Sequence, residues 1–200
     1  MVLTESRMLP LGEPLPFTVI QAAWGAGRLE QVAGAPLDLD RLLNRPVLVL
    51  FLCAHCPFVK HIEPELTRLQ HDLAASDLAW LAVSANSTLT HPQDGAEGLR
   101  RQAGRCGWHF PYLLDHDQEV AVAFRAACTP DLFLFDRHHR LAYRGQLDAS
   151  RPGSERPPDG GDLRAAIAAV LAGQAPAEPQ RPAVGCNIKW HPGRAPAWAR

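Results

Sequence analysis

The stretch of the chain that decides the fold is residues 46–57, PVLVLFLCAHCP. Residues 46–52 form a continuous apolar run without alternation, which is typical of a strand buried on both faces of a sheet. From Phe58 to Leu73, apolar residues recur at steps of three and four, so this segment is predicted to be a helix. Pro57 suits the first turn of that helix. The stretch therefore predicts a buried strand that runs into a helix, with two cysteines at the junction.

Outward from this junction, short segments predicted as strands and helices alternate along the chain. Upstream, Phe17–Ala22 is predicted as a strand and residues 38–44 as a short helix. Downstream, the predicted order is strand 77–85, helix 92–106, strand 110–114, helix 117–124, a hairpin of strands 132–135 and 141–145, and helix 162–171. This order predicts an α/β protein with a central mixed β-sheet flanked by helices.

The predicted helix 162–171 ends before a long proline-rich segment. Residues 1–173 are interpreted as one domain, with a core at about 38–173, and residues 174–200 as a C-terminal extension. The extension has no periodic pattern, so it is expected either to wrap around the domain or to be partly disordered.

The composition limits the classes of partner and compartment. The net charge is −1, which argues against nucleic acid or a charged membrane surface as a partner. No signal peptide is recognised at the start, and no apolar run is long enough to span a bilayer. The five cysteines are an odd number at uneven spacing, unlike the disulfide framework of a secreted domain. We therefore expect a cytoplasmic protein.

The cysteines at the junction carry the chemical signal. The free amide groups and the dipole at a helix start stabilise an anion such as a thiolate, which is the attacking form of cysteine. We predict Cys53 to be the more exposed, attacking thiol and Cys56 to be the resolving thiol. A protonated His55 between them would favour the thiolate further.

The alternative interpretation of the pair is a metal site built on Cys53 and Cys56, with His55 or distant residues. Such a site needs additional ligands.

A second motif is Cys128-Thr129-Pro130, just before the predicted strand 132–135. A proline is tolerated at the start of a strand, and its peptide bond can be cis.

Several motifs in order along the chain resemble the peroxiredoxin-like group of the thioredoxin superfamily, over about residues 12–190. They are Phe51–Lys60, Phe110–Tyr112 with Asp115, Ala127–Asp131, Tyr143–Gly145 with Asp148, and Gly185–Trp190. The resemblance implies a thioredoxin fold with a C-terminal extension, and the strand predicted at Phe17–Ala22 is an N-terminal β addition to that fold. The resemblance also implies that Pro130 is cis, faces the active site and, with Thr129, shapes the substrate-binding groove.

The chain departs from true peroxiredoxins at two positions that activate the peroxide and the thiolate. Their threonine, three residues before the peroxidatic cysteine, is replaced by Cys53. Their catalytic arginine, which lies just before the later strand, is replaced by Pro130. Arg125 or Arg144 would have to supply the missing charge. Cys56 occupies the peroxidatic position.

Two other cysteines are candidate auxiliary thiols. Cys128 lies two residues before Pro130, and Cys186 lies in the C-terminal extension. The alternative for each is a small buried hydrophobic residue.

We therefore predict a thiol–disulfide oxidoreductase that acts through Cys53 and Cys56. Its substrate is a disulfide in a protein or a small molecule, and it needs an external electron donor but no cofactor. We expect a monomer or homodimer. The alternatives are an antioxidant thiol peroxidase with Cys56 as the peroxidatic cysteine, and a metal-binding or metallochaperone protein.

Overall fold

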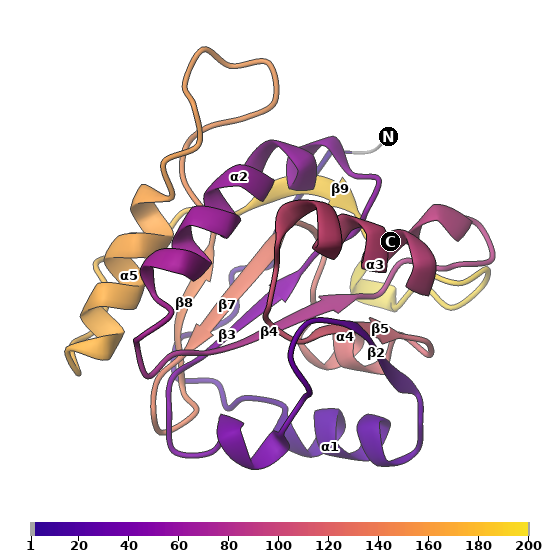
Figure 1. The fold of residues 1–200 in the computed structure, drawn as a ribbon, viewed down its shortest axis with the longest axis horizontal. Coiled ribbons are helices and arrows are strands. Elements are labelled where there is room, and N and C mark those ends of the chain that lie inside the picture. The colour runs from indigo at the N-terminus through magenta and orange to yellow at the C-terminus, as the bar shows by residue number, and fades with distance from the viewer. Residues whose placement is uncertain (1–2, 200) are drawn as a thin grey trace.

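A central mixed sheet forms the core of the protein. The computed structural model describes residues 3–199. The strands of the sheet, in spatial order, are β2 (Leu29–Ala33), β5 (Tyr112–Asp115), β4 (Ala79–Ser84), β3 (Val47–Phe51), β7 (Asp131–Phe135) and β8 (Leu141–Gly145). The three strands β3, β4 and β5 are parallel, and the other pairings are antiparallel. The predicted α/β architecture is thus confirmed (Figure 1).

Helices cover both faces of this sheet. One face is covered by α2 (Pro57–Asp72), α3 (Ala96–Cys106) and α5 (Gly161–Leu171), and the other by α1 (Phe17–Gly25) and α4 (Glu119–Ala123). Short 3-10 helices lie at Leu39–Leu42, Pro92–Asp94 and Ala197–Ala199. Within residues 3–199, none of these helices has the length and apolar character needed to cross a bilayer.

The central position of β3 explains its uninterrupted apolar sequence. Leu48 and Leu50 belong to the core under α2, whereas Val49 and Phe51 belong to the core under α1 and α4. All five residues of the strand are fully buried. Both faces of β3 therefore need apolar side chains, as the sequence predicted.

A second, smaller sheet brings the N-terminal strand together with a strand of the C-terminal extension. It consists of β1 (Leu3–Glu5), β9 (Val184–Asn187) and β6 (Cys128–Thr129), with β9 in the middle and both pairings antiparallel. The C-terminal extension therefore wraps back over the domain, and β9 passes near the N-terminal end of α2 (Figure 1).

Two features of the N-terminal region differ from the prediction. The segment Phe17–Ala22 is not a strand but lies within α1, where Ile20 and Ala23 pack against the sheet. Its β-branched residues favour a strand locally, but burial of its apolar side chains against the sheet outweighs that propensity. The second difference is β2, which was not predicted and which pairs with β5.

The packing of α2 on the sheet gives a test of the fold. Leu66 is fully buried between α2 and β3, so Leu66→Ala is expected to lower the free energy of unfolding by about 2–5 kcal/mol, measured by urea denaturation. Leu89→Ala is the control, because Leu89 is 76% exposed, and it should change that free energy by less than about 0.5 kcal/mol. Equal effects of the two substitutions would contradict this packing.

Candidate functional site

The site is built where β3 ends and α2 begins. The chain leaves the sheet after Phe51, and Cys56 is the N-cap residue of α2, with Pro57 at its first position. Proline favours this place because its missing N–H is not needed in the first turn. The backbone amide of Val59, in that turn, is directed at the Cys56 sulfur and favours its thiolate. The predicted junction is therefore present.

Three sulfur atoms meet at this junction. The Sγ atoms of Cys56 and Cys186 are 2.8 Å apart, and Cys53 lies close enough to Cys56 for each side chain to shift the pKa of the other. Thr129 contacts both cysteines of the pair: its Oγ1 is 3.3 Å from Cys53 Sγ, and its carbonyl oxygen is 3.1 Å from Cys56 Sγ. All of these cysteines are free thiols. Cys186 thus joins the predicted pair as a third thiol.

The pKa values of the three thiols are shifted in opposite directions. The interaction with the Cys53 side chain is the largest of the causes that lower the pKa of Cys56, to about 5. Burial opposes this shift, and the interaction with Cys186 adds to it. The interaction with Cys56, together with burial and the charge of Asp94, raises the pKa of Cys53 well above its ordinary value. Burial and the bond to Cys56 raise the pKa of Cys186 to about 12. Cys56 is therefore the most acidic of the three thiols.

The exposure predicted for Cys53 is wrong. Cys53 and Cys56 are both 0% exposed, and Cys186 is 2% exposed. Part of the junction is covered by β9, whose Cys186 lies against Cys56, and no local pattern predicts this placement. The physical reason is a long-range pairing of β9 with β6, which brings the C-terminal extension onto the cysteines.

An acidic residue that the sequence analysis missed holds the loop between the two cysteines. Asp94 is fully buried, and its Oδ1 accepts hydrogen bonds from the backbone amides of Ala54 and His55, at 2.9 and 3.1 Å. Its Oδ2 lies 2.5 Å from His55 Nδ1 and accepts from Asn86. Burial opposes ionisation of Asp94, but the hydrogen bonds from His55, Asn86 and Ala54 together lower its pKa.

The imidazole of His55 is thus directed at Asp94 more closely than at sulfur. Its Nδ1 is 3.8 Å from Cys53 Sγ, and its ring stacks on that of His91. On the other side of the loop, Gln102 of α3 donates to the carbonyl of Cys53. The loop that carries both cysteines is therefore fixed by side chains from two distant segments.

The alternative of a metal site can be compared with these contacts. Ligand atoms of Cys53, His55 and Asp94 lie within 4.8 Å of one another. However, both oxygens of Asp94 already accept hydrogen bonds from the loop and from Asn86, and one of those donors is the His55 nitrogen nearest to Cys53. The hydrogen bonds of Asp94 therefore hold the loop between the two cysteines in place.

The Thr129–Pro130 peptide bond is cis, as predicted. The backbone of Thr129, which the sequence assigned to substrate binding, is paired instead with β9, where it faces Cys186. The edge expected to receive an extended peptide is thus occupied by the chain itself.

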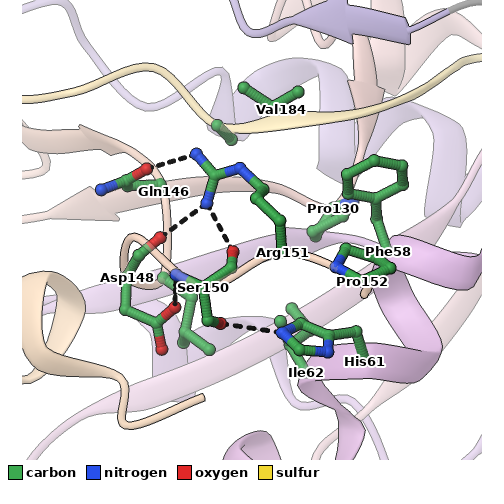
Figure 2. Close-up of a pocket in the computed structure, with 12 residues that line it drawn as sticks. Phe58, His61, Ile62, Pro130, Gln146, Asp148, Ser150, Arg151, Pro152 and Val184 are labelled. Carbon is green, nitrogen blue, oxygen red and sulfur yellow. Dashed lines mark hydrogen bonds between the residues drawn. The ribbon is translucent and has the colours of Figure 1, made fainter. Parts of the chain in front are cut away.

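A hollow lies beside Pro130 and next to β9. Figure 2 shows Pro130, Phe58 and Val184 on its wall, with the guanidinium of Arg151 opposite. Arg151 donates to the carbonyls of Asp148 and Ser150 and to the side chain of Gln146. The lining, within the described residues, includes no cysteine. The hollow therefore borders the thiol site without reaching the sulfurs.

The remaining candidate residues lie outside the thiol contacts. Cys128 is buried, with its Sγ 3.4 Å from the carbonyl oxygen of Pro130, and burial raises its pKa well above the ordinary value. Arg144 donates to Leu9 and Gln180, while Arg125 lines a cavity formed by other segments. Over residues 3–199, neither arginine makes a hydrogen bond to a cysteine. The substitute charge considered for peroxide activation is thus not found at Cys56.

Comparison with known proteins supports this description of the fold. Residues 22–144 match the profile of the AhpC/TSA family. The search of curated proteins finds no significant match.

Two solved structures are similar over nearly the whole chain. An uncharacterized conserved protein from Geobacillus kaustophilus is 40% identical, with a TM-score of 0.86, over 96% of this chain and 98% of that one. A hypothetical protein from Sinorhizobium meliloti is 36% identical, with a TM-score of 0.83, over 95% and 100% of the two chains. A thiol-disulfide isomerase from Corynebacterium glutamicum is 20% identical, with a TM-score of 0.55, over 74% and 92%. This last likeness identifies the thioredoxin fold.

The opposite pKa shifts can be tested by titration of the reduced protein. The ultraviolet absorbance of a thiolate is expected to appear as the pH rises through about 5 and to be absent there in Cys56→Ser. Cys53→Ala removes the largest cause of the low pKa of Cys56, so its titration should move up toward the ordinary value of about 8.5.

Cys106→Ala is the matched control for this titration. Burial raises the pKa of Cys106 to about 11, and its removal should leave the titration near pH 5 unchanged. A wild-type protein with its first thiol titration at the ordinary value would contradict the assignment of the thiolate to Cys56.

Proposed function

Because the chain belongs to the AhpC/TSA family, we propose that it is a thiol–disulfide oxidoreductase whose redox couple is Cys53 and Cys56. The observation that carries the proposal is the position of Cys56 at the start of α2, where its pKa is lowered to about 5 and Cys53 lies beside it. A thiolate is the nucleophile of disulfide exchange, and a second thiol in contact with it can complete the reaction.

The order of the pKa values supports attack by Cys56, the reverse of the roles expected from the sequence. The Cys56 thiolate attacks one sulfur of a substrate disulfide, whose S–S bond breaks and whose other sulfur leaves as a thiolate. Cys53 then gives up its proton and attacks the Cys56 sulfur in the mixed disulfide. The Cys53–Cys56 bond forms, and the second substrate thiolate leaves and takes the proton. An external dithiol donor reduces the pair again, without a cofactor.

The surrounding residues are proposed to position this exchange. Asp94 holds the amides of Ala54 and His55, and so fixes the loop between the two sulfurs. Thr129 contacts both sulfurs, and the next residue, Pro130, lines the hollow of Figure 2. Since the thiols are buried, small disulfides fit the closed form better than disulfides of folded proteins.

A thiol peroxidase is the second candidate function. It is favoured by the low pKa of Cys56, which occupies the peroxidatic position, and by a closed site suited to a small oxidant. Cys56 would attack the peroxide to give a sulfenic acid, which the Cys53 thiol converts to a disulfide with release of water. Rapid consumption of hydrogen peroxide by the wild type, lost in Cys56→Ser, would favour this candidate.

The proposed oxidoreductase is tested with glutathione disulfide as the substrate and a dithiol as the donor. Cys56→Ser is expected to reduce the rate to that of the buffer blank, because it removes the only low-pKa thiol of the pair. Cys53→Ser should still release glutathione in its first turnover, because attack by Cys56 does not need the resolving thiol. Cys106→Ala should match the wild type. Released glutathione is measured by chromatography.

The reverse result would contradict the assigned roles. If Cys53→Ser released no glutathione while Cys56→Ser still did, Cys53 would be the attacking thiol. If the wild type itself reacted no faster than the blank with both glutathione disulfide and hydrogen peroxide, the redox function would be contradicted.

A further inference from the structure

The C-terminal strand β9 is placed as an internal partner of the thiol site. It pairs with β6 so that Cys186 faces Thr129, and this register brings Cys186 Sγ to 2.8 Å from Cys56 Sγ. In the described structure β6 pairs with no strand other than β9. Binding of an extended segment at a strand edge is a general mode of peptide recognition. Here the chain's own C-terminal segment fills that edge and presents a thiol.

Contacts on both sides of Cys186 fix this placement. Before it, Ala183 exchanges two hydrogen bonds with Ser6. After it, Lys189 accepts a hydrogen bond from the Ser87 amide and donates its own amide to Asn86, the residue that also donates to Asp94. The strand and the loop of the cysteine pair therefore share one hydrogen-bonded support.

A glycine makes the close approach of the backbone possible. A Cβ atom at Gly185 would lie 2.1 Å from the carbonyl oxygen of Thr129, which is backbone and cannot rotate away. The residue next to Cys186 is thus adapted to bring β9 directly against the Thr129–Pro130 peptide. Cys186 is held at Cys56 by the strand pairing, the flanking hydrogen bonds and this glycine together.

We propose that Cys186 is a third redox thiol, which exchanges with the Cys53–Cys56 disulfide to form a Cys56–Cys186 disulfide that fastens β9 over the site. This inference rests on the proposed function, because that function supplies the first disulfide. Cys186 loses its proton and attacks the Cys56 sulfur, the Cys53–Cys56 bond breaks, and Cys53 leaves and takes up the proton. The protein holds one disulfide before and after, so the step needs no oxidant or reductant.

The charges around Cys186 agree with this step. In the reduced protein, the hydrogen bond to the Cys56 thiolate helps to keep Cys186 protonated. Oxidation of Cys56 removes that anion, while the nearby charge of Lys189 continues to favour the Cys186 thiolate. Cys186 therefore becomes a better nucleophile once the first disulfide has formed.

The two oxidised forms would present different surfaces. With the Cys53–Cys56 disulfide, β9 is held only by noncovalent contacts and can leave the edge of β6. With the Cys56–Cys186 disulfide, that edge is blocked covalently, and a peptide cannot pair with Thr129. The exchange thus determines whether the site is open to an extended protein substrate.

The test is a map of disulfides in the full chain. Wild type, Cys53→Ser, Cys186→Ser and Cys106→Ala are oxidised with glutathione disulfide, alkylated in acid, digested with trypsin and analysed by mass spectrometry. Lys60 separates Cys186 from the other two cysteines, so the Cys56–Cys186 bond joins two peptides while the Cys53–Cys56 bond lies within one. Circular dichroism checks that each variant is folded, and Cys53→Ala replaces Cys53→Ser if that one is not.

The expected result is both disulfides in the wild type and in Cys106→Ala. Cys53→Ser should give only Cys56–Cys186, and Cys186→Ser only Cys53–Cys56. If Cys186 were alkylated in every sample while Cys53–Cys56 formed, the inference would be overturned and the proposed function would stand. If the wild type formed no disulfide at Cys56, both would fail.

A matched pair of glycine substitutions tests the role of β9 separately. Gly185→Ala should displace the strand, increase the alkylation rate of reduced Cys56 several-fold and abolish the Cys56–Cys186 bond while Cys53–Cys56 still forms. Gly104→Ala is the control, because a Cβ atom at this site in α3 would meet nothing within 4 Å. Equal alkylation rates in the two variants would contradict the covering role of β9.

Discussion

The buried negative charge on Cys56 is the constraint on which the site depends. An isolated anion in an apolar interior is strongly disfavoured, so it must receive hydrogen bonds from groups placed for it. Here the Val59 amide in the first turn of α2 and the neighbouring side chains of Cys53 and Cys186 lower the pKa of Cys56. The helix is positioned by its packing on β3, and Cys186 by the pairing of β9. The core and the C-terminal extension therefore meet at one sulfur atom.

The sequence predicted the elements whose signal is local. The apolar run at 46–52 was sufficient for β3, and the helical spacing after it for α2, because each pattern reflects burial of that segment alone. Helix α1 was misassigned, since its β-branched residues favour a strand and only the sheet face that it covers makes it a helix. The strand β9 had no alternating pattern, because its partners β1 and β6 determine its conformation.

The residues of the candidate site were likewise predicted only where their signal is local. The cysteine pair and the cis peptide before Pro130 carried signals in adjacent residues. Asp94 lies 38 residues after Cys56 in a polar segment, and only the folded chain brings it to the loop amides. The burial of the pair could not be predicted from local sequence either, because Cys186, on a strand that begins at Val184, packs against Cys56. Local patterns identify reactive residue types, whereas their protonation and access depend on long-range contacts.

A third thiol changes what determines which disulfide the oxidised protein contains. The Cys53–Cys56 and Cys56–Cys186 disulfides share one sulfur and contain the same number of electrons, so the ambient redox potential cannot select between them. Their ratio depends instead on the stability of β9 on the edge of β6 and on the protonation of Cys53 and Cys186. Any ligand that competes for that edge would shift the balance toward Cys53–Cys56. Strand pairing at the C-terminus and thiol chemistry at the start of α2 are thereby one coupled equilibrium.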